Sequence, residues 1–307
     1  MPFFSVVIPT YNRALFLPGT IDSVLAQDYD DFEIVVVDDG STDGTAEVIE
    51  TNYACETKVR YYKQPNSERG AARNNGFKQA RSPYVVFLDS DDLMHTDHLS
   101  TLAKIVAEHP DANFLATKFA IVRDGRRQAT GLEAITEGWH GLELFLHGDP
   151  IGSVFCVNKN NPKIKLFEED RRYAVMEDWM FLVENLAGER IYIRDEITIT
   201  VVDHAERSMR SDNRAIIEKK LLAAEWITSR VSLSEPQKRI LRGYAFYFCA
   251  IHSYLDRDRK AGLGYLRRAA LLVKPDVKLF TLCLKILLGF DVVQKAKNSR
   301  LLLSRDH

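Results

Sequence analysis

One stretch of this chain, residues 84–92, constrains the fold more than any other, and its sequence is YVVFLDSDD. The first five residues are apolar, which is typical of a strand that is buried on both faces. Three of the last four residues are aspartates. A buried parallel strand that ends in carboxylates places negative charge at the carboxyl edge of a sheet, where open α/β folds bind ligands. We therefore predict an α/β fold with a ligand site at this edge.

The crowded aspartates also suggest what the ligand contains. Carboxylates this close in sequence repel one another unless a cation or a set of donors lies between them. A hard cation such as Mg²⁺ or Mn²⁺, itself bound to phosphate, is a common solution. A solvated turn that caps the next helix is the alternative for an isolated Asp-Ser-Asp, and the sequence ahead of this stretch favours the ligand site.

Strands and helices alternate through the first part of the chain. The second predicted strand also ends in carboxylates, Asp38 and Asp39. This alternation predicts a doubly wound, mainly parallel sheet with right-handed crossovers. Neither Gly-x-Gly-x-x-Gly nor a Gly-Lys-Ser/Thr loop follows the first strand, so dinucleotide binding and P-loop chemistry are poorly supported. Predicted strands cover residues 4–9, 32–37, 59–62, 84–88, 114–122, 151–157, 191–194 and 197–202; residues 125–138 resemble a turn or loop.

The charge distribution divides the 307 residues into two parts. Residues 214–307 contain 19 Lys and Arg against 8 Asp and Glu, a net charge of +11, whereas the rest of the chain carries −13. Helical periodicity also dominates from about residue 214 onward. We predict an α/β domain over residues 1–213 and a basic α-helical region over residues 214–307. The last apolar run, 279–293, is interrupted by Lys285 and Asp291 and is too short to span a bilayer.

The cysteines and the N-terminus bear on location. The four cysteines show neither metal-ligand spacing nor a disulfide framework, which favours a reducing compartment. The N-terminus has no basic region ahead of an apolar run, so we expect no signal peptide. These features predict a cytoplasmic protein. The cysteines are Cys55, Cys156, Cys249 and Cys283.

Four short blocks of sequence, taken together, resemble one family. They are SVVIPTYNR at 5–13, VDDGSTDGT at 37–45, ARN at 72–74 and FLDSDD at 87–92. Their order and spacing are similar to those of the family 2 glycosyltransferases, and the resemblance covers about residues 3 to 208. These are inverting enzymes of the GT-A fold that use nucleotide-activated sugars. The resemblance therefore implies a GT-A nucleotide-sugar-binding fold with an α-helical C-terminal appendage.

The resemblance also implies roles for single residues. Asp39 would accept a hydrogen bond from the base, typically from the N3–H of uracil, while Arg73 and Asn74 would reach the nucleotide. Asp89 and Asp91 match the Asp-x-Asp motif, the first near the ribose and the second on a Mn²⁺ or Mg²⁺ ion that bridges the diphosphate. The predicted nucleotide-sugar-binding set is Pro9, Thr10, Tyr11, Arg13, Asp39, Arg73, Asn74, Asp89, Ser90 and Asp91.

Two later segments complete the predicted site. Glu177-Asp178 matches the acidic pair of this fold, in which the second carboxylate, Asp178, is the general base; simple capping of a helix is the alternative for the pair. His204 occupies the place of a late histidine that contacts metal or diphosphate, although an exposed loop histidine would fit as well. Arg207 and Ser208 could bind phosphate oxygens. The predicted metal ligands are Asp91 and His204.

The function implied by the resemblance is inverting, metal-dependent transfer of a sugar, of the hexosyltransferase type. The donor would be a nucleotide diphosphate sugar, most often a UDP-sugar, and the acceptor a glycan or lipid-linked hydroxyl in cell-envelope or extracellular polysaccharide synthesis. A non-catalytic sugar-nucleotide or glycan-binding module and a nucleotidyltransferase are the alternatives. The acidic first two-thirds argues against nucleic acid. For the basic helices, a peripheral contact with the inner face of the cell membrane, packing on the catalytic domain and a homodimer all remain open.

Overall fold

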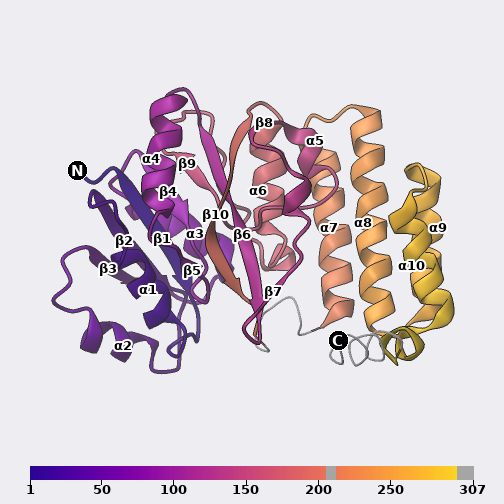
Figure 1. Cartoon of the computed structure of the whole chain (residues 1–307), viewed down its shortest axis with the longest axis horizontal. Coiled ribbons are helices and arrows are strands. Elements are labelled where there is room, and N and C mark those ends of the chain that lie inside the picture. The colour runs from indigo at the N-terminus through magenta and orange to yellow at the C-terminus, as the bar shows by residue number, and fades with distance from the viewer. Residues whose placement is uncertain (205–211, 296–307) are drawn as a thin grey trace, which may run out of the picture. The chain divides into compact units, whose positions relative to one another are not determined.

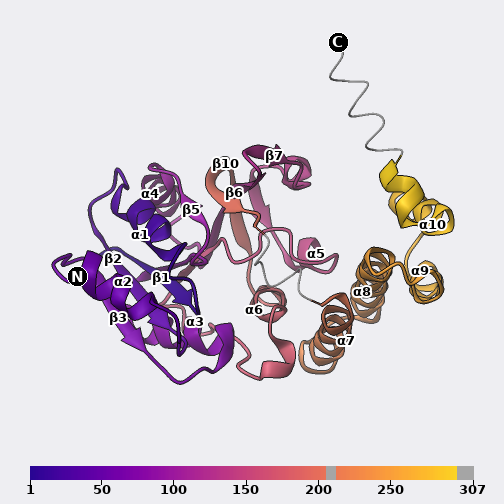
Figure 2. The same cartoon turned by 90° about the horizontal axis from the view of Figure 1, so that it is seen from below.

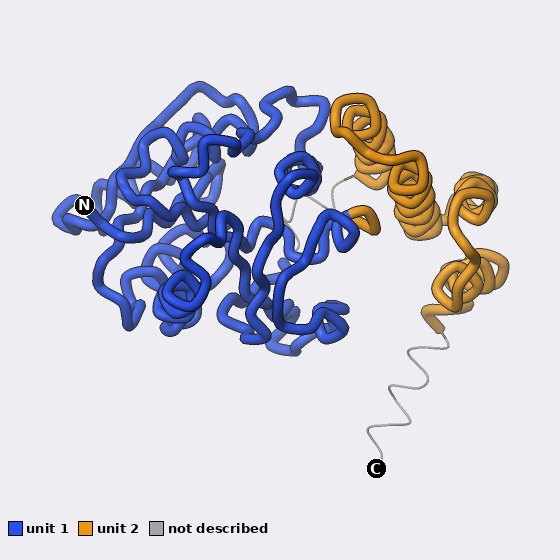
Figure 3. The backbone as a smooth tube through the Cα atoms, turned by 90° about the horizontal axis from the view of Figure 1, so that it is seen from above, with its two compact units in different colours: residues 1–145, 149–205 blue, residues 146–148, 206–307 orange. Residues whose placement is uncertain are grey.

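The computed structural model describes residues 1–204 and 212–295. It divides into two compact units: residues 1–145 and 149–205 form the first, and residues 146–148 and 206–307 the second (Figure 3). The domain boundary predicted at residue 213 stays a prediction. Within the described residues, all four cysteines are free. None of the helices in the described ranges is both long enough and apolar enough to cross a membrane.

A mixed sheet forms the centre of the first unit, with the strand order β3-β2-β1-β4-β9-β6-β10-β5 (Figure 1). The pairs β1–β2, β2–β3 and β1–β4 are parallel, as predicted for the N-terminal half. Strand β9 runs antiparallel to both of its neighbours, so the sheet is mixed. The strands are β1 (Phe4–Thr10), β2 (Phe32–Asp38), β3 (Val59–Lys63), β4 (Tyr84–Phe87), β5 (Leu93–Met94), β6 (Phe114–Arg123), β7 (Arg126–Gln128), β8 (Gly138–His140), β9 (Cys156–Asn158) and β10 (Ile191–Val202).

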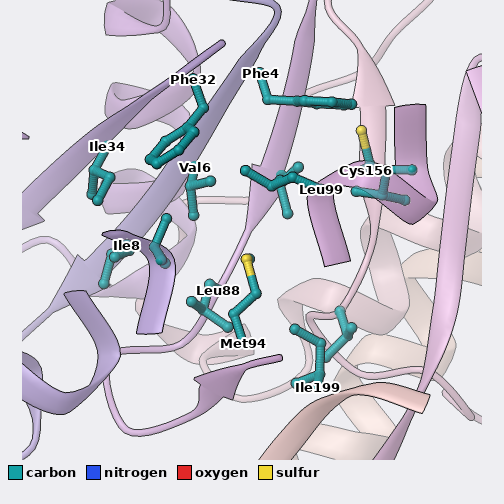
Figure 4. Close-up of a cluster of buried hydrophobic side chains, with 14 of the residues drawn as sticks. Phe4, Val6, Ile8, Phe32, Ile34, Leu88, Met94, Leu99, Cys156 and Ile199 are labelled. Atoms are coloured by element: carbon teal, nitrogen blue, oxygen red, sulfur yellow. The ribbon is translucent and has the colours of Figure 1, made fainter. Parts of the chain in front are cut away.

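Helices cover both faces of this sheet. Figure 2 shows α1 (Leu17–Leu25) and α4 (His98–Glu108) on one side and α3 (Glu68–Gln79) and α6 (Glu177–Leu186) on the other. Helix α2 (Thr45–Asn52) adds Ile49 to the core on the α1 side. Every residue of β1 and β2 is buried, because each strand is covered on both faces. Figure 4 shows the apolar cluster on the α1 side, where Val6, Ile8 and Leu99 meet.

Three segments differ from the predicted elements. The strand expected over 151–157 is reduced to β9, because the Asp149 side chain accepts hydrogen bonds from the backbone of Ile151 and Gly152 and forms a turn there. The two strands expected at 191–202 are one strand, β10, whose pairing with β6 is irregular between Ile193 and Ile199. The predicted loop 125–138 contains β7, a 3₁₀ turn (Leu132–Ala134) and the first residue of β8.

The second unit is α-helical over its described residues, as its periodicity predicts. Its helices begin at polar caps: the Asp212 carboxylate accepts from two backbone N–H groups of α7, and Ser234 forms a capping box with Gln237 on α8. Asp258 and Asp276 cap α9 and α10 in the same way. The core of this unit comes from α8, α9 and α10. The helices are α7 (Asn213–Arg230), α8 (Glu235–Leu255), α9 (Arg259–Leu272) and α10 (Val277–Leu288).

Candidate active site

The carboxyl ends of β1, β2 and β4 lie side by side at one edge of the sheet. Thr10 is in register with Asp38 on β2, and Val7 is in register with Phe87 on β4. Because these strands are parallel, the residues that follow each one emerge at the same edge. The register therefore brings the segments that follow Thr10, Asp38 and Phe87 together, although they are distant in sequence.

The two carboxylates at the end of β2 are held by donors of the chain itself. Asp38 is fully buried and accepts from the backbone of Ser41 at 2.7 Å and from the Tyr61 hydroxyl at 2.5 Å. Asp39 is 4% exposed, and its Oδ1 accepts from the Ser67 backbone N–H and from Gln64 Nε2, both at 2.8 Å. Its Oδ2 accepts from the Glu68 backbone N–H at 2.8 Å. Since a carboxylate offers about four acceptor positions, Oδ2 retains room for a further donor.

Arg73, on α3, links three carboxylates from two other segments. Its guanidinium donates to Asp89 Oδ1 at 2.7 Å and to Glu177 Oε1 at 2.9 Å, and Nη1 lies 3.3 Å from Asp178 Oδ1. The Arg73 side chain is 0% exposed. Burial works against its charged form, but the three carboxylates dominate and raise the pKa of Arg73 above its ordinary value. The guanidinium is therefore a fixed positive charge beneath the edge of the sheet.

A group of aromatic rings lies beneath this guanidinium. The Arg73 Cζ atom is 5.6 Å from the centre of the Phe167 ring, which stacks on Phe181 at 4.1 Å. Phe87 at the end of β4 and Phe155 complete the group, with ring centres 5.5 Å apart. Rings of this kind stabilise a cation over their faces and exclude water from beneath it. They therefore strengthen the ion pairs of Arg73 with the carboxylates.

Each carboxylate of the acidic pair at the start of α6 has a buried oxygen without a hydrogen bond among the described residues. Glu177 is 2% exposed, and within residues 1–204 and 212–295 no donor forms a hydrogen bond with its Oε2. Oδ1 of Asp178 is likewise buried and has only the ion pair with Arg73. The backbone just ahead of the pair is strained, because Val175 has a φ of +72°, a rare conformation for a β-branched residue. Holding the pair in place therefore costs conformational free energy, as is common at functional sites.

The environment of Asp178 raises the pKa of its carboxyl group well above the ordinary value. Burial is the main cause, and the guanidinium of Arg73 opposes it. Three neighbouring carboxylates raise the pKa further by repulsion, those of Glu177, Asp89 and Asp149. A carboxyl group with a raised pKa is a stronger base once ionised, which suits proton abstraction near neutral pH.

Asp91 lies at the centre of a second set of contacts. Its Oδ2 atom is 2.9 Å from His204 Nε2 and 3.5 Å from Arg13 Nε. The His204 ring stacks on Phe16, with ring centres 4.4 Å apart. The other ring nitrogen of His204, Nδ1, is buried and accepts or donates no hydrogen bond among the described residues. The chain thus brings together Asp91, His204 and Arg13, which the sequence placed in one site.

The donors in this set fit a divalent cation. Asp89, Asp91 and Asp92 each offer a carboxylate oxygen, and these oxygens lie within 4.8 Å of one another. Asp92 is 1% exposed, and its carboxylate accepts from the Val202 backbone N–H at 3.2 Å, which gives it a structural role. Carboxylate oxygens with an imidazole nitrogen form a donor set that Mn²⁺ accepts and that also suits Mg²⁺. Asp91 belongs to this cluster, and the predicted roles of Asp91 and His204 as metal ligands stay predictions.

Asn74 follows Arg73 on α3, but its side chain is occupied by the chain itself. Its amide nitrogen donates to the backbone carbonyl of Phe167 at 2.9 Å and to Glu169 Oε1 at 2.7 Å. Its amide oxygen accepts from the Phe167 backbone N–H at 2.9 Å. The close approach of this loop also requires Gly70, because a Cβ there would lie 2.3 Å from the carbonyl oxygen of Glu168. Asn74 thus fixes residues 167–169, and its predicted contact with the nucleotide stays a prediction.

The remaining predicted residues lie at the same edge with different exposures. Thr10 is 3% exposed, and its Oγ1 is buried with no hydrogen bond inside the described part of the chain. Tyr11 is 46% exposed and Ser90 only 6%. Pro9 is a buried residue of β1. Their predicted roles in nucleotide binding stay predictions, as does that of Arg13. Arg207 and Ser208 lie outside the described residues.

The sequence of this chain was compared with models of known protein families. Residues 5–165 match the family model described as glycosyl transferase family 2. This match covers more than half of the chain. The chain belongs to glycosyl transferase family 2. The match ends before Glu177, so the acidic pair of α6 lies beyond it.

Two curated glycosyltransferases are each similar to this chain over about a third of its length. Glycosyltransferase GlyA of Streptococcus pneumoniae is 38% identical over 105 residues, which are 34% of this chain and 15% of that protein. The GalNAc(5)-diNAcBac-PP-undecaprenol beta-1,3-glucosyltransferase of Campylobacter jejuni is 39% identical over 104 residues, 33% of this chain and 34% of that one. The matches therefore span about a third or less of these two relatives.

Solved structures confirm the GT-A fold. The S. aureus TarS fragment 1–349, crystallised with UDP-GlcNAc, has a TM-score of 0.68 at 24% identity, covering 88% of this chain and 84% of that one. The mannosyltransferase PcManGT of Pyrobaculum calidifontis, in complex with GDP-Man and Mn²⁺, has a TM-score of 0.60 at 18% identity, covering 98% and 81%. At these identities the likeness concerns the fold alone.

Sequence reasoning missed three residues of the site in this family 2 chain. Asp149 influences the pKa of Asp178, Phe16 supports the His204 ring, and Phe167 lies beneath Arg73. Asp149 and Phe16 stand in segments without a regular pattern, so no periodicity marks them. Phe167 precedes three acidic residues, which was the only available signal.

Proposed function

We propose that this protein transfers a sugar from a nucleotide diphosphate to an acceptor hydroxyl, with inversion at the anomeric carbon. One observation carries the proposal: Arg73 joins the carboxylate of Asp178, whose pKa is raised, to Asp89 of the Asp-x-Asp motif. A base and the predicted donor site are thereby linked by a single buried side chain. A module that only bound sugar nucleotides would not need a buried carboxylate with a raised pKa.

In the proposed reaction Asp178 acts as the general base. The ionised carboxylate takes the proton of the acceptor hydroxyl while the acceptor oxygen forms a bond to the anomeric carbon. The bond between that carbon and the diphosphate oxygen breaks from the opposite face, and the nucleoside diphosphate leaves with the bonding electrons. Arg73 fixes the direction of the Asp178 carboxylate, and its charge keeps part of the population ionised despite burial. Arg73 therefore acts as a positioning residue for Asp178 in this proposal.

A divalent cation, Mn²⁺ or Mg²⁺, would be held by Asp91 and His204. When bound, it would neutralise the charge that develops on the leaving diphosphate. Because two protein ligands are too few for an octahedral site, we expect the cation to bind only together with the nucleotide. Calorimetry with Mn²⁺ alone should show no tight binding, and adding UDP should produce it. Tight Mn²⁺ binding without nucleotide, or full activity in the presence of EDTA, would contradict this.

The proposed donor is a UDP-sugar. Asp39 would accept the N3–H of uracil on Oδ2, the oxygen that retains room for a donor. Further support comes from TarS, which was crystallised with UDP-GlcNAc. PcManGT, in contrast, was solved with GDP-Man, so the base must be determined by experiment.

The proposed acceptor is a glycan or lipid-linked hydroxyl in the synthesis of cell-envelope polysaccharide, with the enzyme acting in the cytoplasm. The support comes from relatives. The Campylobacter jejuni glucosyltransferase is named for an undecaprenol-linked glycan. A putative teichuronic acid biosynthesis glycosyltransferase, TuaG of Bacillus subtilis, is 33% identical over 125 residues, which are 40% of this chain and 50% of that protein.

A panel of nucleotide sugars tests the proposal. The purified chain is incubated with each UDP- and GDP-sugar and Mn²⁺, and release of nucleoside diphosphate is followed with and without simple acceptor glycans. NMR of the product then reports the anomeric configuration. We expect release from at least one UDP-sugar and an inverted product. A retained configuration would contradict Asp178 as the base.

The same panel, extended with nucleoside triphosphates and sugar phosphates, separates the alternatives. A binding module would bind a nucleotide sugar but release no diphosphate, and Asp178→Asn would change nothing. A nucleotidyltransferase would release pyrophosphate when given a nucleoside triphosphate and a sugar phosphate. Either outcome would overturn the proposed transfer.

A further inference from the structure

Helix α10 has apolar side chains on two opposite sides. Leu279, Leu282 and Ile286 face the core of the second unit and are at most 5% exposed. A second row on the same helix, which we term the exposed row, faces outward. Its members are between 46% and 80% exposed: Val277, Phe280, Leu284, Leu287 and Leu288.

The exposed row occupies one continuous arc of the helix. At about 100° per residue, its members fall within an arc of about 100°, opposite the buried side chains. Scattered exposed leucines are ordinary, but a contiguous apolar row on a short helix marks a surface that binds something. A helix that is apolar on both sides is otherwise found where both sides are covered.

Positive charge accompanies this apolar surface. Lys278 and Lys285 are seven residues apart, so they lie together along one flank of the exposed row. Both also line a groove of about 350 Å³ between α8 and α10, together with Tyr254, Leu255 and Val277. Over residues 259–295 there are eight Lys and Arg against two Asp and Glu, a net charge of +6.

Apolar side chains flanked by lysines match one kind of partner best. A second copy would bring the same +6 segment onto itself, since a symmetric dimer pairs identical surfaces. An anionic lipid surface offers the opposite charge together with an apolar layer a few ångströms below it. The described helices include none that could span a bilayer, so the contact would be made in the plane of the interface.

We propose that α10 binds the surface of an anionic lipid bilayer, with the exposed row inserted among the acyl chains and Lys278 and Lys285 on the headgroup phosphates. This inference does not depend on the proposed transfer reaction. It concerns the second unit alone, and its test uses no catalytic measurement.

Vesicle flotation with the full chain tests the proposal. Vesicles of phosphatidylcholine mixed with phosphatidylglycerol are compared with vesicles of phosphatidylcholine alone, at low and at physiological salt. We expect the protein to float with the anionic vesicles, less so at physiological salt, and to remain at the bottom with the neutral ones.

Two variants probe the two parts of the contact. F280E/L287E places charge within the exposed row and should lower the partition coefficient at least tenfold. K278Q/K285Q should lower it about fivefold per lysine. Leu15→Glu introduces one carboxylate at an 83% exposed leucine of the first unit and should float like the wild type. Circular dichroism confirms that each variant is folded, which these exposed positions favour.

Three results would overturn the proposal. The protein could remain unbound with both vesicle types at low salt, or F280E/L287E could float as well as the wild type while folded. Alternatively, sedimentation could show a dimer that F280E/L287E abolishes, with no flotation of the wild type. That last result would assign the exposed row to a second copy of the chain.

Discussion

The carboxylates at the end of β2 and those at the start of α6 differ in their partners. Asp38, Asp39 and Glu177 are at most 4% exposed, and the Asp178 side chain is 20% exposed. Asp38 and Asp39 accept hydrogen bonds from backbone and side-chain donors of the same chain. Glu177 and Asp178 instead share one guanidinium, and each retains a buried oxygen without a hydrogen bond among the described residues. The chain itself supplies hydrogen-bond donors to the β2 pair, whereas each carboxylate of the α6 pair keeps an oxygen without one among the described residues.

This difference indicates different chemical roles for the two pairs of carboxylates. Donors to an ionised carboxylate favour the charged form, so a carboxylate with a full set is a stable acceptor that shapes a loop or binds a ligand. A buried carboxylate that lacks them favours the protonated form and exchanges a proton more readily. The difference supports the proposed roles of Asp39 in binding and of Asp178 in proton transfer.

The largest expected effect is that of Asp178→Asn on turnover. The amide keeps the shape of the side chain but cannot take a proton. Turnover should fall by about 10²–10⁴-fold, while donor affinity, measured by calorimetry, should barely change. Glu184→Gln is the control on the same helix, because its carboxylate contacts Lys165 rather than Arg73. If Asp178→Asn lost donor affinity as well, Asp178 would be a residue that binds the sugar donor. The two pairs of carboxylates would then not differ in role.

His98 tests whether a buried polar atom without a hydrogen bond is enough to indicate a catalytic group. It is 2% exposed, its Nε2 has no hydrogen bond in the described ranges, and burial lowers its pKa to about 3. The unfolded chain binds this proton near pH 6.5, so the folded form loses stability as the pH falls below that value. The loss is about 1.4 kcal/mol per pH unit until about pH 3.

We therefore expect His98→Gln to flatten the acid side of the stability profile, measured as the free energy of unfolding in urea between pH 7 and pH 4. Turnover at neutral pH should be unchanged, because His98 bonds to Thr198 in the interior of the first unit. A large loss of turnover in folded His98→Gln would contradict this, because the unpaired nitrogen of His98 would then mark a group needed for catalysis.

Asp39→Asn should affect binding more than rate. The amide nitrogen cannot accept, so at least one of the three hydrogen bonds from Gln64, Ser67 and Glu68 is lost. Donor affinity should fall about tenfold, which corresponds to about one lost hydrogen bond to a charged group. Turnover at saturating donor should stay within about threefold. Asp30→Asn, at the opposite end of β2 and fully exposed, is the matched control. A selective loss of turnover would reverse the assignment of Asp39.

The smallest expected effect is that of Asp149→Asn, which should shift the pH dependence of turnover. The asparagine oxygen still accepts from the backbone of Ile151 and Gly152, so the turn is retained. Removing the negative charge of Asp149 lowers the pKa of Asp178, because that charge raises it. Asp178 is then ionised at lower pH. The pH at which turnover rises on the acid side of the profile should therefore fall by a few tenths of a unit. A shift to higher pH would contradict the role of Asp149.

Much of the fold follows from local pattern in the sequence. Runs such as Val6–Ile8 and Val35–Val37 predict buried strands, and the alternation with helices predicts the parallel half of the sheet. The antiparallel position of β9 could not be predicted, because it depends on long-range pairing with β4 and β6. The break ahead of β9 depends on the turn made by Asp149, which a run of apolar residues hides.

The site was predictable where neighbours in sequence are neighbours in space. Asp89 and Asp91 follow one strand, so their proximity is given by the chain itself. The partners of Arg73 were not predictable, because helical periodicity does not tell which distant segment a face meets. The Arg73 guanidinium donates to Glu177, which is 104 residues away in the sequence, and its predicted contact with the nucleotide stays a prediction. Asn74 and its partner Phe167 are 93 residues apart in the sequence.

The contact of Arg73 with the acidic pair has a consequence for the order in which the protein is made. A nascent chain exposes α3 long before Glu177 and Asp178 leave the ribosome, so until then Asp89 is the only one of the three carboxylates available. A fragment trimmed to the family match, residues 5–165, would remain in that state. Since removing one side of a buried ion pair costs about 3–5 kcal/mol, such a fragment should expose Arg73 or fail to close α3 onto the sheet. The smallest autonomous piece of this protein therefore extends at least through α6.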